Sequence, residues 1–169
     1  LIVCGASVNV VNNRHESPII LACQRGLIDL VKLFHYYFAS PTIKDIYDNT
    51  LMHHACINGN IDVVKYLISL DLPLDTQNKY YETPLFLAID NQYKEIVLLL
   101  LKNCAIDNIY NEYGDMLLHL AVERADNYLG EEIAIIFIKY VSDIDIQNNQ
   151  GKTPLMIACE NNYDFVARE

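Results

Sequence analysis

Apolar residues along this chain fall into short runs that come in pairs, and a polar stretch follows each pair. The first run of each pair is about six residues long and closes on an alanine, at positions 22, 55, 88, 121 and 158. These alanines are 33, 33, 33 and then 37 residues apart. A repeating period of roughly 20–50 residues indicates a stack of similar units. We therefore predict five similar units, each built from two helices.

The first run of each unit has the features of a helix start. Its leading Ser or Thr can accept an unpaired backbone N–H, and a following proline fits the first helical position. Units one, three and five keep both residues, whereas unit two has Leu51 in place of proline and unit four begins with Met116 and Leu117. We expect the first helix of unit four to be less stable by roughly 1 kcal/mol. The runs are 17–22, 50–55, 83–88, 116–121 and 153–158.

The second run of each unit opens with an acidic residue and is dense in apolar residues. The acid suits the positive N-terminus of a helix, and the dense pattern is typical of a helix packed between neighbours. In unit four this run starts four residues late, at Glu132, which predicts an enlarged loop between the helices over residues 124–131. The same unit carries one extra residue between Asp107 and Gly114. The second runs of units one to three are 29–34, 62–67 and 95–100.

The period and the Thr-Pro-Leu-His-x-Ala pattern of the first runs make the chain resemble an ankyrin-repeat array of about five repeats. The resemblance implies an all-α solenoid of stacked helix-turn-helix units with extended, β-hairpin-like fingers. It also implies hydrogen bonds between repeats from the histidine of the pattern, kept here as His53 and His119. We predict one ankyrin-repeat domain over residues 1–169, with a partial repeat at 1–9, repeats at about 10–42, 43–75, 76–107 and 108–145, and a truncated repeat at 146–169. Since both ends cut through repeats, we expect a fragment of a longer chain.

The five cysteines are placed for packing rather than for cross-linking. Cys23, Cys56 and Cys159 each follow the closing alanine of a first run, so the same small buried position recurs in three units. Cys4 and Cys104 lie near the ends of second helices. We therefore predict reduced thiols in an intracellular protein, cytoplasmic or nuclear.

Patterns for catalysis, cofactors or metals do not occur in the sequence. His53 and His54 are adjacent, and adjacent helical side chains point about 100° apart, so the two cannot chelate one ion. The sequence has no Cys-x-x-Cys, no Gly-x-Gly-x-x-Gly and no phosphate-binding loop. We predict that the chain is not an enzyme and has no cofactor and no metal.

The net charge of −10 is concentrated in the second half of the chain. Residues 1–84 hold 8 acids and 6 Lys or Arg, giving −2, and residues 85–169 hold 14 acids and 6 Lys or Arg, giving −8. An acidic array repels the phosphate backbone, which excludes nucleic acid as a partner. No apolar run approaches the roughly 18 residues that span a bilayer, which excludes membrane insertion. We expect a monomer.

The resemblance also implies where a partner binds, because ankyrin repeats use the fingers and the exposed face of the first helices. Tyr47, Tyr80 and Tyr113 share one finger position and form an aromatic row, which suits either a contact surface or stacking along the fingers. Acidic residues gather beside the far end of this row. We predict a protein partner with a basic segment, bound by Tyr47, Tyr80, Tyr113, Glu82, Asp90, Glu112, Asp115 and Glu123.

Three functions fit these observations. The first is a protein–protein interaction module that binds its partner on the concave surface formed by the fingers and first helices. The second is a regulatory ankyrin domain of a larger enzyme or channel that docks on its own chain. The third is a structural spacer.

Overall fold

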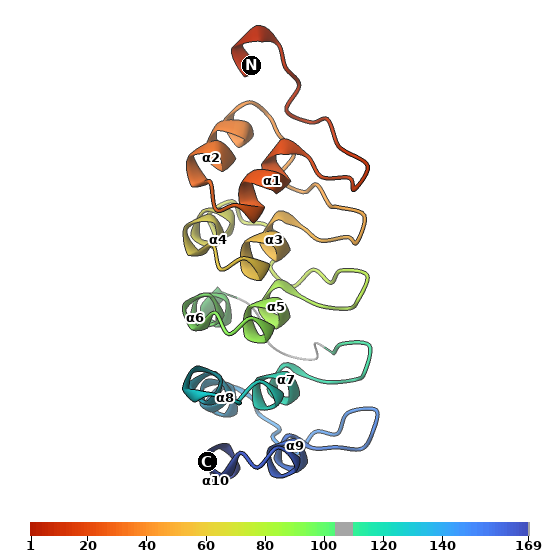
Figure 1. Ribbon diagram of the computed structural model, residues 1–169, viewed down its shortest axis with the longest axis vertical. Helices are drawn as coiled ribbons and strands as arrows, with labels where there is room; N and C mark the ends of the chain where they lie inside the picture. The colour runs from red at the N-terminus through yellow and green to blue at the C-terminus, as the bar shows by residue number, and fades with distance from the viewer. Residues whose placement is uncertain (104–109, 169) are drawn as a thin grey trace.

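The computed structural model describes residues 1–103 and 110–168 of the chain (Figure 1). Its helices form an elongated stack, and no strand occurs among the described residues apart from an isolated bridge between Tyr110 and Met116. The all-α solenoid predicted from the sequence is therefore confirmed. The elements are η1 (Ile2–Cys4), α1 (Pro18–Gln24), α2 (Ile28–Tyr36), α3 (Leu51–Ile57), α4 (Ile61–Ile68), α5 (Pro84–Asp90), α6 (Lys94–Asn103), α7 (Leu117–Glu123), α8 (Tyr128–Tyr140), α9 (Pro154–Glu160) and α10 (Asp164–Arg168).

The helices form two layers, with the fingers projecting from one side of the stack (Figure 1). The inner layer is α1, α3, α5, α7 and α9, in which each helix contacts the next, and the outer layer is α2, α4, α6, α8 and α10. Each inner helix also contacts the outer helix that follows it in the chain. The alanines at 22, 55, 88, 121 and 158 are all buried. A small side chain at this point lets neighbouring inner helices approach closely, which explains why the alanine recurs.

The helix caps agree with the sequence in three of the five pairs. The side chains of Thr50, Thr83 and Thr153 each accept the backbone N–H of the third helical residue. The prediction is wrong for Ser17, because its hydroxyl is buried and has no hydrogen-bond partner among the described residues. In the fourth pair, His119 Nδ1 accepts the N–H of Met116 at 3.2 Å and so replaces part of the missing cap.

The enlarged loop predicted for residues 124–131 is not present. Residues 124–127 separate α7 from α8, one more than the three residues between α5 and α6, and α8 has 13 residues where α6 has 10. One inserted residue therefore enters the turn, and three lengthen the helix. Asn127 caps this longer helix, because its side chain accepts the N–H groups of Leu129 and Gly130. Gly130 then packs against the backbone of Arg124, where a Cβ atom would lie only 2.0 Å from the carbonyl oxygen. The insertion is thus absorbed by a local cap and a glycine.

The turn between the two helices of a pair has a residue with positive φ in four pairs. Gly26 and Gly59 occupy this position in the first two pairs, and Gln92 and Asn162 replace glycine in the third and fifth, with φ of 57° and 59°. The fourth pair has no such residue among those described, because its turn runs directly into the Asn127 cap.

The cysteine prediction is confirmed only in part. Cys23 and Cys56 are buried. Cys23 joins no disulfide in the described structure, and burial raises the pKa of its thiol to about 12. Cys159, predicted to be buried, is exposed because no further helix pair covers α9 in the described structure. Cys104 and residues 107–109, the first part of the segment from Asp107 to Gly114 with its extra residue, lie outside the described residues.

Candidate protein-binding groove

Five fingers with one shared geometry form the edge of the candidate site. We define fingers 1 to 5 as residues 12–16, 45–49, 78–82, 111–115 and 148–152. The first residue of each is Asn or Asp, and its Oδ1 accepts two backbone N–H groups, from the third and fifth residues of the finger. The fourth residue of each finger has positive φ. This side-chain-to-backbone pairing fixes a tight turn, so the third residue stands at the same place in every finger.

A groove of about 510 Å³ lies between fingers 3 to 5 and the inner helices α5, α7 and α9. Its apolar lining residues are Phe86, Leu120 and Ile157, one from each of these three helices, and all three are buried. Seven of the eight residues predicted from the sequence line this groove: Tyr80, Glu82, Asp90, Glu112, Tyr113, Asp115 and Glu123.

Tyr47, the eighth predicted residue, does not line the groove but supports it. Its ring stacks on Tyr80, with centroids 6.0 Å apart and an angle of 30° between the rings. The aromatic row predicted from the sequence is therefore a stacked pair plus Tyr113, which makes no ring contact in the described structure. The stacking interpretation is therefore confirmed for Tyr47 and Tyr80, and the contact-surface interpretation stays a prediction.

The acidic groups of the groove are held by hydrogen bonds from neighbouring amides and from tyrosine. Glu82 accepts from Asn78 at 2.9 Å, and Asp115 accepts from Asn148 at 2.6 Å. The hydroxyl of Tyr113 donates to Glu112, and this hydrogen bond raises the pKa of Tyr113. The carboxylates are thus positioned on the finger edge before any partner arrives.

Two cations in the groove were not included in the predicted site. The guanidinium of Arg124 lies 2.7 Å from Asp90, and Lys152 Nζ lies 2.6 Å from Glu160. The register could have found Lys152 and Glu160, because they occupy the repeat positions of Glu82 and Asp90. These pairs neutralise carboxylates of the inner helices and leave those of fingers 3 and 4 without a cationic partner among the described residues.

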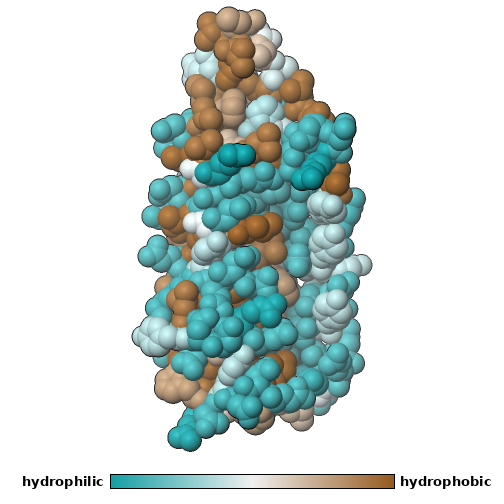
Figure 2. All heavy atoms as spheres, in the orientation of Figure 1, coloured by the Kyte–Doolittle hydropathy of each residue, from teal (hydrophilic) through white to brown (hydrophobic). Residues whose placement is uncertain are grey.

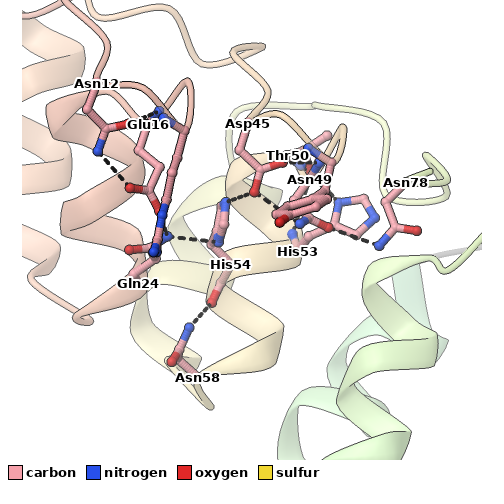
Figure 3. A network of polar contacts seen from close by, with 12 residues as sticks. Asn12, Glu16, Gln24, Asp45, Asn49, Thr50, His53, His54, Asn58 and Asn78 are labelled. Atoms are coloured by element: carbon pink, nitrogen blue, oxygen red, sulfur yellow. Dashed lines mark hydrogen bonds and ion pairs between the residues drawn. The ribbon is translucent and has the colours of Figure 1, made fainter. Parts of the chain in front are cut away.

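A second set of polar residues crosses the concave side of the first three fingers (Figure 3). Gln24 contacts Glu16 at 3.1 Å and His54 Nδ1 at 3.3 Å, which joins the first and second helix pairs. His54 Nε2 lies 3.2 Å from Asp45, an ion-pair distance, but makes no well-aligned hydrogen bond in the described structure. Burial lowers the pKa of His54 although the nearby carboxylate of Asp45 acts to raise it. The ring is therefore neutral at neutral pH.

The network continues to the third finger through amides. Asn49 donates to Asp45 at 3.0 Å, and Asn78 donates to Asn49 at 2.9 Å (Figure 3). Asn78 also donates to Glu82, which lines the groove. A continuous series of side-chain contacts thus connects the first finger with the edge of the groove.

The surface on this side is unevenly hydrophobic. In Figure 2, hydrophobic residues gather at the N-terminal end of the stack, whereas the rest of the visible face is mostly hydrophilic.

Among the described residues no three His, Cys, Asp or Glu side chains form a group that could hold a metal ion. None of the described helices has the length and hydropathy that a membrane crossing requires.

Comparison with known proteins identifies the family. A family model described as ankyrin repeats (3 copies) matches residues 1–78 and 19–111. The chain belongs to the ankyrin-repeat family, whose repeats are in general non-catalytic protein-interaction modules.

The similar curated proteins are much longer than this chain. It is 30% identical over 166 residues to a transient receptor potential cation channel subfamily A member 1 homolog of Caenorhabditis elegans, covering 97% of this chain and 13% of that protein. It is 32% identical over 148 residues to palmitoyltransferase AKR1 of Lachancea kluyveri, covering 82% and 19%. It is also 32% identical over 146 residues to the putative palmitoyltransferase ZDHHC13 of Danio rerio, covering 84% and 22%. The chain thus spans less than a quarter of the length of each.

Proposed function

We propose that this chain binds a protein partner in the groove between fingers 3 to 5 and the inner helices, and that it has no catalytic activity of its own. The observation that carries the proposal is the groove itself, since it combines two half-exposed tyrosine rings with fixed carboxylates above an apolar floor. Aromatic side chains that are already ordered contribute contact area at low entropic cost. Tyr80 and Tyr113 are therefore the proposed anchors.

The charge of the groove favours a basic segment as the bound part of the partner. Six lining residues are acids and two are cations, which gives a net charge of −4 (−6 and +2). The two cations are already engaged by Asp90 and Glu160. The carboxylates that have no cationic partner in the described structure lie on fingers 3 and 4, beside tyrosine faces. Such faces attract Lys or Arg by cation–π contact.

Selection from a random 12-residue peptide library tests this proposal. The purified chain is the bait, and selected peptides are measured against two double variants. Tyr80→Ala with Tyr113→Ala removes the proposed anchors. Tyr36→Ala with Tyr140→Ala is the matched control, because these exposed tyrosines lie on α2 and α8 and do not line the groove. Equal thermal stability of the two variants shows that both are folded.

We expect the selected peptides to be basic and to bind the groove variant about 5- to 30-fold more weakly, the equivalent of roughly 1–2 kcal/mol. The control variant should bind like the parent chain. Neutral or acidic peptides, or equal binding to both variants, would contradict the proposal. A chain that selects no peptide at all would favour the structural spacer.

The relatives favour one alternative, a regulatory domain that docks on its own longer chain. The similar proteins include a cation channel homolog and palmitoyltransferases, in which this region is a small part. The test compares a selected peptide on the isolated chain and on the full-length protein. If a segment of the same protein occupies the groove, the peptide binds the isolated chain and fails to bind the full-length one. Equal affinities would exclude this alternative.

We further propose a monomer that works in the cytoplasm or the nucleus. The compartment is supported by Cys23, which is buried and joins no disulfide in the described structure. Light scattering and imaging of a tagged full-length protein check these two points. A stable dimer would contradict the first, and a secreted protein would contradict the second.

A further inference from the structure

The contacts between neighbouring fingers differ along the array. We call the contact between fingers 2 and 3 joint 2/3, and name the other joints in the same way. At joint 2/3 the N–H of Lys79 donates to the carbonyl of Tyr47 at 2.9 Å, and at joint 4/5 the N–H of Asn149 donates to that of Tyr113 at 3.2 Å. Joint 1/2 has the equivalent bond from Ile46 to Arg14. These bonds hold neighbouring fingers together backbone to backbone.

Joint 3/4 lacks this bond in the described structure. The equivalent groups are the N–H of Glu112 and the carbonyl of Tyr80, and no hydrogen bond joins them. The amide bond found at joint 2/3, from Asn78 to Asn49, also has no counterpart in the described structure, where Asn111 donates to Asp115 of its own finger but not to finger 3.

Joint 3/4 also lacks a second kind of anchor. His53 Nε2 donates to the carbonyl of Glu82, and His119 Nε2 to that of Lys152, so each histidine anchors the last residue of the next finger. The first and third pairs have Ile20 and Phe86 at this position, which cannot donate a hydrogen bond, but joint 1/2 keeps its backbone bond and joint 3/4 has neither anchor in the described structure. Finger 4 is therefore held less firmly against finger 3, although Gln77 still donates to the carbonyl of Tyr110 beside it.

The groups that face this opening have one chemical character. The Tyr80 and Tyr113 side chains lie on its two sides without ring contact, and both line the groove. The carbonyl of Tyr80 and the carboxylates of Glu82 and Glu112 are hydrogen-bond acceptors from fingers 3 and 4, and the two carboxylates are negatively charged. Asp115 is engaged at the next joint, because its Oδ1 accepts from Asn148 of finger 5. A ligand here needs a positive charge, a flat face and several donors in one plane.

We infer that joint 3/4 receives an arginine side chain of the partner, inserted between fingers 3 and 4. This inference rests on the proposed function and adds the residue type and the place to it. The guanidinium is planar, stacks on aromatic faces and offers five donors, whereas the lysine ammonium is a compact and strongly hydrated charge. Two tyrosine faces with acceptors on both fingers suit the first group better than the second.

Two synthetic peptides of equal charge test the inference, five Gly-Arg repeats and five Gly-Lys repeats. Calorimetric titrations use the parent chain and the single variants Tyr113→Ala, Tyr113→Phe and Tyr140→Ala. Equal peptide charge removes general electrostatic attraction from the comparison. Tyr140 provides the matched control, because it is an exposed tyrosine on α8 that does not line the groove.

We expect the Gly-Arg peptide to bind the parent chain at least fivefold more tightly than the Gly-Lys peptide. Tyr113→Ala should abolish this preference, while Tyr113→Phe, which keeps the ring, and Tyr140→Ala should retain most of it. Equal binding of both peptides to the parent chain would overturn the arginine inference and leave a basic partner in place. A preference for the Gly-Arg peptide that survives Tyr113→Ala would overturn the location at joint 3/4. If neither peptide binds the parent chain, the arginine inference is overturned. The proposed function is then judged separately, by the library selection.

Discussion

Joints 2/3 and 3/4 separate neighbouring repeats of the same array, yet they are built differently. At joint 2/3 a histidine, an amide and a backbone N–H all bridge the fingers, and the Tyr47 and Tyr80 rings stack across it. At joint 3/4 the histidine is replaced by Phe86, and the backbone bond is absent from the described structure. The groove collects the aromatic and acidic residues of this second joint.

Under the proposed function, the difference explains how a repeat array gains a binding site without a dedicated domain. In a solenoid, stability is a sum of repeat and interface contributions, so one weakly bonded interface is tolerated when its neighbours are strong. The polar groups left unpaired at that interface are then available to a partner. Local departures from a stabilising pattern are expected at functional sites.

The largest effect that we expect is a loss of stability at acidic pH, caused by His53 at the bonded joint 2/3. Burial lowers the pKa of His53 to about 4, well below the 6.5 of an unperturbed histidine. On acidification, His53 of the unfolded chain therefore binds a proton near pH 6.5, whereas His53 of the folded chain binds it only near pH 4. The free energy of unfolding should fall by about 3 kcal/mol across this window because of His53 alone, and stay reduced below it.

Urea unfolding at several pH values measures this effect, and His53→Phe copies joint 3/4 at joint 2/3. The variant should lose about 3 kcal/mol of the pH dependence between pH 6.5 and 4. His54→Gln is the matched control and should keep the His53 contribution. An unchanged pH profile in His53→Phe would show that the ring is not a buried neutral donor.

The second prediction concerns the fourth helix pair, where the insertion depends on one glycine. Gly130→Ala should destabilise the fold by about 2 kcal/mol, since the new methyl group would meet the backbone of Arg124 and force α8 to move. Gly151→Ala is the control, because no atom lies within 4 Å of its Cβ position and only the positive φ opposes it. Thermal unfolding should rank Gly130→Ala as the more damaging. The opposite order would contradict the proposed packing of α8.

The smallest predicted change in stability comes from a substitution that restores the missing helix N-cap of the same pair. Met116→Thr should raise the free energy of unfolding by about 1 kcal/mol, because threonine can accept the N–H of His119 as Thr50 accepts that of His53. Thr83→Ala, in the neighbouring pair, should lower it by a similar amount. A Met116→Thr variant with no gain in urea unfolding would mean that His119 already completes the cap.

The repeat period was sufficient to predict the stack of helix pairs and most of the groove. Because the units share one register, residues at equal offsets lie on one surface, and Tyr80, Glu82 and Asp115 were found in this way. The register could not predict the open joint, because Ile20 and Phe86 both replace the histidine and yet only joint 3/4 lacks the backbone bond in the described structure. It also misplaced the insertion, since Asn127 as a cap and Gly130 as a close contact act only in three dimensions.

Hydrogen exchange of four equivalent amides, followed by NMR in the free chain, tests the central claim most directly. The amides of Ile46, Lys79 and Asn149 donate to the preceding finger, whereas that of Glu112 has no partner in the described structure. We predict that Glu112 exchanges at least about tenfold faster than Lys79 and Asn149, since the loss of roughly 1.4 kcal/mol of protection is a factor of ten. Equal protection of all four amides would show that joint 3/4 is closed like the others and would contradict the account.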